Sequence, residues 1–350
     1  MLSGHGSNIR STVFLRDGKR ALSASWDGSV RMWDIENRCA LGEPIIQHNS
    51  YMLSVAVSPD AKLIASSGGT HTFISDAEDG QLIMGPTLVH KSWVNWVCFS
   101  PDGKALATGS DDRTVAIWNV ETGRALVPPF QAHFAQVRCV SFSPDGQRLL
   151  TASNDNTIRV WEVNTGRPFE PGFTQPIVGH TNGITCAIWS HRGEQIISSS
   201  MDGTIGFWDS TTGEQIGDFC RGHTAPIWSI DLAPSGEYLS SASFDGTIRL
   251  WNITTHAQIG PPVEHGDEVY STAFSPDGLS IISGGHAAEG GVFLWDVRSL
   301  VQVGEPWRGH ISINSLALSP DGTRIASASK ESTAHFWDTD SGDPVGEPLE

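Results

Sequence analysis

Short segments in which apolar and polar residues alternate recur along the whole chain, separated by turn residues. The stretch His133–Gly166 holds one complete example. Val137–Phe142 alternates as a half-buried strand does, Arg148–Ser153 repeats the alternation, and Thr157–Trp161 is rich in β-branched residues. Turn sequences such as Pro144-Asp145-Gly146 separate them. The pattern predicts three antiparallel strands, which need neighbours of the same kind to bury their faces.

The same pattern returns at a nearly fixed period. A His and a Trp mark it, and successive His residues are 43, 42, 43, 47, 43, 42 and 45 positions apart. Self-similarity at 42–47 residues over the full length is the signature of a repeat architecture. The marker His residues are His5, His48, His90, His133, His180, His223, His265 and His310, and the marker Trp residues are Trp33, Trp118, Trp161, Trp208, Trp251, Trp295 and Trp337.

The residues at both ends of the repeat resemble those of the WD-repeat family. Gly-His begins several units, as at Gly179-His180, and Trp-Asp ends several, as at Trp208-Asp209. The resemblance implies an all-β fold, a β-propeller of four-stranded blades. Eight units predict eight blades, with seven as the alternative. The second unit has Ser75 in place of the Trp but keeps its His and its spacing, so we interpret it as a degenerate blade.

We expect one domain over residues 1–350, with units near 5–47, 48–89, 90–132, 133–179, 180–222, 223–264, 265–309 and 310–350. The segments between each Trp and the next His are alike, and each is expected to form an outer strand after a Thr-Gly turn. The chain ends with such a segment. We therefore expect about Pro344 to Leu349 to pair with the first unit, which would close the ring by interlocking the termini.

Composition excludes several classes of function. The net charge of −17 disfavours affinity for nucleic acid or anionic membranes, because phosphate binding needs clustered Lys and Arg. No apolar run approaches the roughly 18 residues of a membrane span, and the N-terminus lacks the apolar core of a signal peptide. Five scattered Cys without a CxxC favour a reducing compartment. We expect a cytoplasmic protein, monomeric as an isolated domain.

Five units carry a His, a hydroxyl, an Asp and a Trp at fixed offsets. Such a set looks like a Ser/His/Asp triad, but a catalytic set occurs once and this one recurs. The resemblance implies a structural chain of hydrogen bonds from Asp to His, to the hydroxyl, to the indole, so we expect no catalytic residues. The sets are His5, Ser23, Asp27, Trp33; His90, Thr108, Asp112, Trp118; His133, Thr151, Asp155, Trp161; His180, Ser198, Asp202, Trp208; and His223, Ser241, Asp245, Trp251.

The second, seventh and eighth units depart from this pattern and should be less rigidly tied. Glu331 replaces the Asp in the eighth, and the seventh has an irregular turn near 284–291. His71, His286 and His335 could ligate a metal, but each lies in a different unit, so we interpret them as surface residues. Phosphate-binding loops and zinc-protease motifs are absent from the sequence. We expect no metal and no cofactor.

Six Trp lie outside the Trp-Asp positions. Trp189 takes the position of the core residue Phe142, and Trp307 lies in an outer segment where it should pack between blades. In WD-repeat proteins the other positions open onto one face of the ring near the channel. Aromatic residues with Arg and Met suit a protein or peptide docking face. The expected binding face comprises Trp26, Tyr51, Trp93, Asn95, Asp111, Arg138, Asn154, Met201, Trp228, Phe244, Tyr270 and Lys330.

Three functions remain open at this stage. The first is a non-catalytic interaction scaffold or ligand-sensing module that binds a protein or peptide. The Gly-Glu-Pro sequences of the outer segments resemble those in the WD-repeat sensor arrays of fungal signal-transducing (NACHT-type) ATPases. No nucleotide-binding domain is present in this sequence. The second is a glycan- or small-molecule-binding propeller. The third is an enzyme, since eight-bladed rings include quinone-dependent dehydrogenases.

Overall fold

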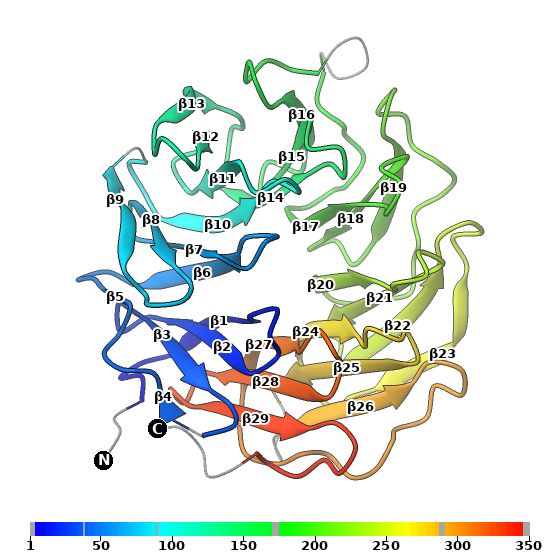
Figure 1. Ribbon diagram of the computed structural model, residues 1–350. Coiled ribbons are helices and arrows are strands. Elements are labelled where there is room, and N and C mark those ends of the chain that lie inside the picture. The colour runs from blue at the N-terminus through cyan, green and yellow to red at the C-terminus, as the bar shows by residue number, and fades with distance from the viewer. Residues whose placement is uncertain (1–3, 38, 89, 170–174, 287–290, 346–350) are drawn as a thin grey trace. The chain divides into compact units, whose positions relative to one another are not determined.

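The structure is a computed structural model that describes residues 4–37, 39–88, 90–169, 175–286 and 291–345. These residues form eight antiparallel sheets and no helix, as Figure 1 shows. The first three strands of each sheet pair in chain order, and each sheet is built from one repeat unit; in the first sheet, both β4 and β5 pair with β3. The second unit, predicted to be a degenerate blade, forms a complete four-stranded sheet.

The strands have the following bounds. The first sheet contains β1 (Ile9–Phe14), β2 (Arg20–Ser25), β3 (Ser29–Asp34), β4 (Cys39–Ala40) and β5 (Ile46–Gln47). The second contains β6 (Met52–Val57), β7 (Leu63–Gly68), β8 (His71–Asp76) and β9 (Leu82–Leu88), and the third β10 (Val94–Phe99), β11 (Ala105–Ser110), β12 (Thr114–Asn119) and β13 (Ala125–Gln131). The fourth contains β14 (Val137–Phe142), β15 (Arg148–Ser153) and β16 (Ile158–Glu162), and the fifth β17 (Ile184–Trp189), β18 (Gln195–Ser200) and β19 (Ile205–Asp209). The sixth contains β20 (Ile227–Leu232), β21 (Tyr238–Ser243), β22 (Thr247–Asn252) and β23 (Gln258–Glu264). The seventh contains β24 (Val269–Phe274), β25 (Ser280–Gly285) and β26 (Val292–Asp296), and the eighth β27 (Ile313–Leu318), β28 (Arg324–Ser329) and β29 (Ala334–Asp338).

The fourth sheet shows how closely the alternation of residues fixes the strands. The predicted strands at 137–142 and 148–153 are confirmed, and the third begins one residue later than expected. In the turn between the first two, the carboxylate of Asp145 accepts the N–H of Gln147 at 3.0 Å. Gly146 follows with φ of 69°, a conformation that glycine adopts without strain. The turn residues therefore set the hairpin locally.

The outer strands are less complete than the sequence predicts. A continuous fourth strand is present in the second, third and sixth sheets as β9, β13 and β23. In the fourth, fifth and seventh sheets the described outer segment meets the third strand only at isolated bridges, for example Val292 with Trp307. Between its two bridges the segment of the seventh sheet contains Gly304, with φ of 71°, and Pro306, which has no N–H to donate. Four continuous strands are therefore present in the second, third and sixth sheets, whereas in the fourth, fifth and seventh sheets the described part of the outer segment pairs at isolated bridges instead.

The C-terminal segment does not pair with the first unit where the structure describes it. Pro344 bridges to Trp337, and the N–H of Val345 donates to the carbonyl of Phe336 at 2.7 Å, both within the eighth unit. The remaining residues of the expected closing strand, 346–349, lie outside the described residues. The interlocking prediction is wrong for Pro344 and Val345, because a tight turn after β29 returns the chain directly onto that strand.

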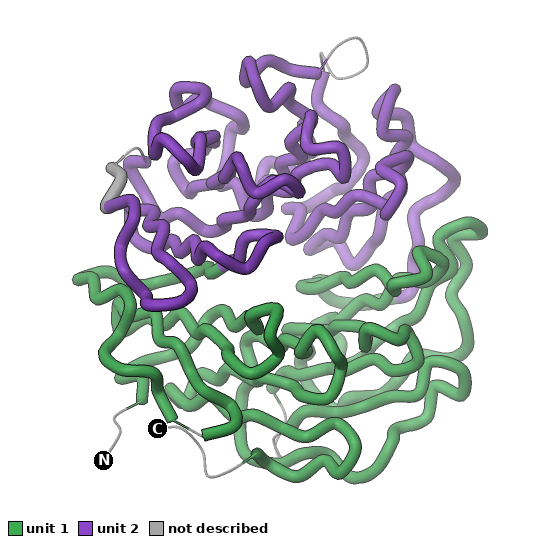
Figure 2. Tube along the Cα trace, in the orientation of Figure 1, with its two compact units in different colours: residues 1–55, 223–350 green, residues 56–222 purple. Residues whose placement is uncertain are grey.

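The chain divides into two compact units, coloured separately in Figure 2. Unit 1 comprises residues 1–55 and 223–350, and unit 2 comprises residues 56–222. Unit 1 brings the first and last repeats together. The amide of Asn314 in β27 donates to the carbonyl of Ile9 at 2.8 Å, and the rings of Phe14 and Phe336 meet edge to face at 6.4 Å. Among the described residues, the first and last sheets are therefore joined by a hydrogen bond and by side-chain packing.

Neighbouring sheets bury their apolar faces against each other. In unit 2, Leu150 and Ile158 of the fourth sheet share a core with Trp189 and Trp208 of the fifth. Trp189 is 7% exposed, which confirms its predicted place in the core. In unit 1, Trp307 is 8% exposed and its ring stacks on Trp337 of the next sheet at 6.0 Å, as predicted for an outer aromatic residue that packs between sheets. Within the described ranges, no helix is long and apolar enough to cross a membrane.

Candidate functional site

Each sheet presents variable side chains at one end, through two local features. In seven first strands, the register shifts at the second residue, which makes a β-bulge there. The residue that follows the second strand donates its N–H to the carbonyl just before the first strand. Asn154, for example, donates to Gln136 at 3.0 Å, which brings it beside the bulge residue Arg138. Most of the predicted face residues occupy these bulge and turn positions.

An aromatic row crosses three sheets of unit 1. We use this name for Trp228, Phe244, Tyr270 and Lys330. The ring centroid of Phe244 lies 5.2 Å from that of Trp228 and 5.0 Å from that of Tyr270. The ammonium of Lys330 lies 4.4 Å from the centroid of the Tyr270 ring and donates to its hydroxyl oxygen at 3.0 Å. The row is therefore a continuous line of contacts, with a cation at one end.

The hydroxyl of Tyr270 is also tied to an acid. It donates to the carboxylate of Glu268 at 2.7 Å. Burial and this hydrogen bond raise the pKa of Tyr270 to about 12, so the ring stays neutral and its hydroxyl remains a donor.

A second cluster in unit 1 lies at the first sheet. The rings of Trp26 and Tyr51 stack at 5.1 Å with 24° between their planes, and the guanidinium of Arg10 lies 5.8 Å from the Trp26 ring. Tyr51 is 44% exposed. Within the described part of the chain, the indole N–H groups of Trp26 and Trp228 have no hydrogen-bond partner. Both indoles thus retain an unused donor.

The predicted face residues of unit 2 form mainly polar pairs. The amide of Asn95 donates to Asp111 at 2.6 Å and to the carbonyl of Val137 at 3.0 Å. In the next sheet, Arg138 donates to the side-chain oxygen of Asn154 at 3.2 Å. Asn95, Asp111, Arg138 and Asn154 are thereby linked in two pairs on adjacent sheets.

Two exposed Trp side chains of unit 2 lie in and just before β10. Trp93 directly precedes β10 and is 46% exposed, and Trp96 within β10 is 41% exposed. Met201 occupies the turn position of the fifth sheet, where its N–H donates to the carbonyl of Gly183 at 2.9 Å.

Two exposed apolar residues at this end were missed by the sequence analysis. Phe134 is 75% exposed and Ile311 is 58% exposed, and each directly follows the marker His of its unit. In the fourth unit the N–H of Phe134 donates to the carboxylate of Asp155 at 2.8 Å. The backbone is thus fixed by the Asp while the side chain points away from it. Comparing the residue that follows the marker His across the repeat units would have identified both as apolar residues at this position.

The five repeated sets form the same chain of hydrogen bonds. In the fourth unit His133 Nδ1 lies 3.1 Å from Asp155, His133 Nε2 lies 2.7 Å from the hydroxyl of Thr151, and the indole of Trp161 donates to that hydroxyl at 2.9 Å. The corresponding contacts are present in the sets of His5, His90, His180 and His223. These five His residues are buried, and the same set of contacts recurs in five units, as expected for groups that stabilise the fold.

Burial controls the protonation of this chain. It lowers the pKa of His133 despite the opposing effect of Asp155, so the imidazole is neutral near pH 7. Burial acts to raise the pKa of Asp155, but the hydrogen bonds from His133 and Thr157 outweigh it and hold that pKa well below its ordinary value. A neutral imidazole that donates from Nδ1 to an ionised Asp leaves Nε2 as an acceptor.

The seventh and eighth units, which depart from the repeated set, each retain only some of its hydrogen bonds. In the eighth, His310 and Trp337 both bond Ser327 at 2.9 Å, and Thr333 rather than Glu331 lies at 3.1 Å from His310 Nδ1. In the seventh, the indole of Trp295 donates to Ser283 at 2.8 Å. His265 of that unit is 4% exposed, and within the described ranges both its ring nitrogens are unpartnered.

The three His residues considered as metal ligands belong to three different sheets: His71 lies in β8, His286 directly follows β25, and His335 lies in β29. His286 is exposed and His71 is half-buried, but His335 is only 6% exposed, so its assignment to the surface is wrong. Its ring packs against His310 at 4.0 Å because the second residue of β29 points toward the marker His. No group of three or more His, Cys, Asp or Glu among the described residues could hold a metal ion.

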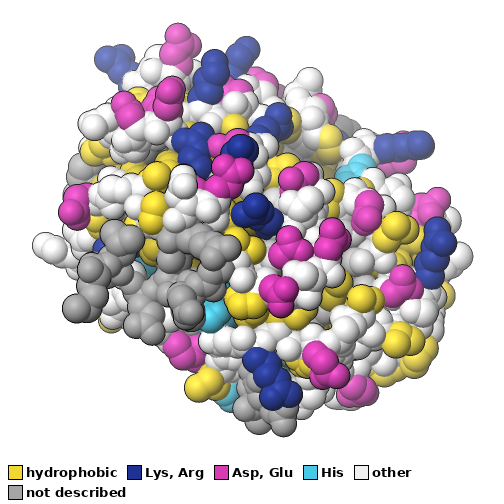
Figure 3. Space-filling model, turned by 60° about the horizontal axis from the view of Figure 1, so that its bottom comes forward, with side chains coloured by type: hydrophobic (Ala, Val, Ile, Leu, Met, Phe, Trp, Pro, Cys, Tyr) yellow, Lys and Arg dark blue, Asp and Glu magenta, His cyan; other side chains and the backbone are white. Residues whose placement is uncertain are grey.

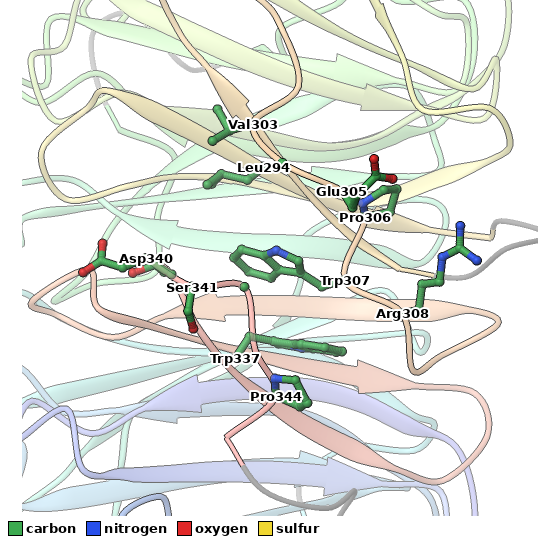
Figure 4. A pocket seen from close by; sticks show the side chains of 13 residues that line it. Leu294, Val303, Glu305, Pro306, Trp307, Arg308, Trp337, Asp340, Ser341 and Pro344 are labelled. Carbon is green, nitrogen blue, oxygen red and sulfur yellow. The ribbon is translucent and has the colours of Figure 1, made fainter.

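A pocket of about 500 Å³ opens between the outer segments of the seventh and eighth sheets in unit 1 (Figure 4). Trp307 and Trp337 form its floor, and Glu305, Arg308 and Asp340 lie around its rim. Both indoles are at most 8% exposed, so the pocket offers little open aromatic surface.

Figure 3 shows Lys and Arg side chains interspersed with Asp and Glu on the face in view.

The repeated sheets and the hydrogen-bond chains define this protein as a WD-repeat protein with a β-propeller fold. A sequence profile described as IFT122 first beta-propeller matches residues 51–338, and one described as WD domain, G-beta repeat matches residues 1–34. The chain belongs to this IFT122 first-propeller family, which confirms the WD-repeat resemblance.

Curated relatives share short segments with the chain. The periodic tryptophan protein 2 homolog of Neurospora crassa is 41% identical over 81 residues, 22% of this chain and 9% of that protein. The small ribosomal subunit protein RACK1y of Oryza sativa subsp. japonica is 44% identical over 64 residues, 18% of each protein. The guanine nucleotide-binding protein subunit beta of Saccharomyces cerevisiae is 41% identical over 69 residues, 19% of this chain and 16% of that protein. The matches thus span less than a fifth of each of these relatives.

Among solved structures, the chain is similar to the computationally designed Ika8 protein. The TM-score is 0.81 at 23% sequence identity, and the alignment covers 96% of this chain and 98% of that chain. At this identity the similarity shows the fold alone.

Proposed function

We propose that this protein is a non-catalytic interaction module that binds a protein or peptide at the end of the sheets that carries the bulge and turn residues. The observation that carries the proposal is the aromatic row of unit 1, in which Trp228, Phe244, Tyr270 and Lys330 form one line of contacts across three sheets. Trp and Tyr are among the residues that most often dominate the energetics of protein interfaces.

Family membership supports the same function. WD-repeat propellers typically serve as protein-interaction scaffolds, and the hydrogen-bond chains that imitate a triad recur in five units. A repeated buried chain suits stability, whereas the side chains at the bulge and turn positions differ from unit to unit and suit recognition. We therefore assign specificity to the bulge and turn positions and no catalytic role to the His residues.

A glycan or small molecule is the second candidate, and the pocket beside Trp307 is what favours it. Sugar rings bind proteins by stacking on open aromatic faces, but Trp307 and Trp337 have theirs covered. This ligand class consequently fits the pocket less well than a peptide fits the aromatic row. A thermal-shift screen or a glycan array tests it directly.

The test of the main proposal compares two sets of variants in a peptide-display selection on the purified chain. Trp228→Ala with Phe244→Ala disrupts the aromatic row, and Trp93→Ala removes an exposed ring of unit 2. Leu126→Ala and Val301→Ala are matched controls, because these exposed apolar residues lie in outer segments. Melting curves of all variants verify that they fold.

Peptides selected on the wild-type chain should lose affinity for the first set by about 30-fold or more, the cost of about 2 kcal/mol at an interface hot spot. They should bind the control variants as they bind the wild type. Equal binding by folded face variants, or loss only in the controls, would place the docking surface elsewhere and refute the proposal.

We also propose that residues 1–350 make one eight-bladed propeller domain. The period of the repeat continues unchanged through residues 55 and 223, where the two units meet in the sequence. A cytoplasmic, monomeric protein is the matching expectation, and none of its five Cys forms a disulfide.

A further inference from the structure

The third residue of the first strand contacts the neighbouring sheet in several repeat units. In unit 1 this residue is a Ser in four sheets, and its hydroxyl accepts an N–H from the next first strand. Ser229 accepts from Thr272 at 3.4 Å, and Ser271 accepts from Leu316 at 3.3 Å. Ser315 accepts from Thr12, and Ser11 from Val55, at 3.3 and 3.4 Å. The position is therefore a regular point of contact between adjacent sheets.

In unit 2 two Cys occupy this position on adjacent strands. Cys139 is the third residue of β14, and Cys186 is the third residue of β17. The Cys139 thiol donates to the carbonyl of Ala187, the neighbour of Cys186, at 3.4 Å. A hydrogen bond also joins the side chains of Cys139 and Cys186. Two thiols from different sheets thus meet where unit 1 has hydroxyls.

The two thiols differ in exposure. Cys139 is 3% exposed and belongs to the core shared by the fourth and fifth sheets, whereas Cys186 is only partly buried against that core. A reagent in solution therefore has access to Cys186 and not to Cys139. Because the two thiols are in contact, Cys139 can react with an oxidised Cys186.

The other buried thiols are chemically different. Burial raises the pKa of Cys220 to about 12 and raises that of Cys98, where the proximity of Cys139 adds to the effect. The hydrogen bond from Cys186 lowers the pKa of Cys139 in spite of its burial. Since the thiolate is the nucleophile, Cys139 is the better attacking group.

We propose that Cys139 and Cys186 form an oxidisable dithiol that closes to a disulfide between β14 and β17 when the protein meets a peroxide. The Cys186 thiolate attacks one oxygen of hydrogen peroxide, the O–O bond breaks, and Cys186 sulfenic acid and hydroxide form. The Cys139 thiolate then attacks the sulfenic sulfur, the S–S bond forms, and a second hydroxide leaves. The two sulfurs together lose two electrons to the peroxide, and the two thiol protons neutralise the hydroxides to water.

The bond would form beside two bulge positions. Arg138 directly precedes Cys139, and Thr185 directly precedes Cys186. The disulfide would fix the separation of the first strands of two adjacent sheets at this point. Formation of this disulfide depends only on the contact of the two thiols and does not require the proposed docking function.

The test treats the reduced full chain with hydrogen peroxide, blocks the remaining thiols, and digests it with trypsin without reductant. Cleavage after Lys104, Arg138, Arg148 and Arg159 separates Cys98, Cys139 and Cys186 into different peptides, so mass spectrometry assigns the linkage without ambiguity. We expect the Cys139–Cys186 linked pair in about tenfold excess over any other pair, and its disappearance after dithiothreitol.

Ser variants provide matched controls, because the fold already uses Ser at these positions. In Cys139→Ser, Cys186 should accumulate as a sulfenic acid that dimedone traps, whereas in Cys186→Ser, Cys139 should stay reduced. Cys98→Ser should form the disulfide normally, since the equivalent residue of β14 is Ser141. A Cys98–Cys139 linkage, only intermolecular disulfides, or two thiols that stay reduced while Cys39 oxidises would each overturn the proposal.

Discussion

Thr151 is the residue through which the buried hydrogen-bond chain of the fourth unit is most directly tested. Its hydroxyl lies 2.7 Å from His133 Nε2 and accepts the indole N–H of Trp161 at 2.9 Å. Because His133 donates from Nδ1 to Asp155, its Nε2 accepts the hydroxyl proton. Thr151→Val keeps the shape of the side chain but leaves the indole N–H and His133 Nε2 without partners.

The expected cost follows from these two groups. An unsatisfied buried polar group costs about 1–3 kcal/mol, so Thr151→Val should lower the free energy of unfolding by about 2–6 kcal/mol. Thr151→Ser keeps the hydroxyl and removes one methyl group, at a cost of about 1 kcal/mol. Ser already fills this position in other units, as at Ser198 and Ser241.

Urea unfolding followed by tryptophan fluorescence measures both variants. The midpoint should fall in the order wild type, Thr151→Ser, Thr151→Val, with the slope against urea unchanged. The NMR signal of the Trp161 indole N–H should shift only in Thr151→Val. If Thr151→Val is as stable as wild type, or Thr151→Ser is the less stable variant, the Thr151 hydroxyl does not stabilise the fold through this hydrogen-bond chain, and the prediction is refuted.

Two further predictions concern pH and packing. Burial lowers the pKa of His265 to about 4, of His310 to about 3 and of His335 to about 4. The unfolded chain therefore binds more protons below about pH 6.5, so the melting temperature should be highest above that pH and fall steadily toward pH 4. A flat melting profile between pH 7 and 4.5, measured by scanning fluorimetry, would contradict these shifts. Gly342 has φ of 71°, and a Cβ there would lie 2.2 Å from Trp307 Nε1. Gly342→Ala should cost about 1–3 kcal/mol more than Gly42→Ala, which has φ of 73° but nothing within 4 Å of its Cβ. Equal urea midpoints for these two variants would show that the hairpin does not close on Trp307.

Local features of the fold were predictable because they depend on short-range patterns. Alternation and turn residues placed β14 and β15 at their observed bounds. The fixed offsets of the His, hydroxyl, Asp and Trp, together with the resemblance to WD-repeat proteins, predicted contacts such as that of His133 with Thr151. Arg138 and Asn154 were both expected on the binding face, but the spacing predicted neither their hydrogen bond nor the bulge at Arg138.

Contacts between sheets were not predictable in the same way. The line from Phe244 to Tyr270 and Lys330 depends on how whole sheets pack, and no short-range spacing encodes it. The interlocking of the termini was inferred from a likeness between segments, whereas Val345 pairs with the nearest free strand of its own unit because a tight turn delivers it there.

By itself, the sequence determined the all-β repeat, the family, the phase of the strands and the buried chains of hydrogen bonds. The repeat and the phase of the strands follow from periodicity within about 45 residues, over which strand pairing and turn chemistry fix geometry. The family and the hydrogen-bond chains follow from the resemblance of the repeat residues to WD-repeat proteins. Only the tertiary structure decided which rings touch, which outer segments complete a sheet, and that the thiols of Cys139 and Cys186 meet. Those outcomes depend on the packing of one sheet against the next, where residues far apart in the sequence compete for the same space.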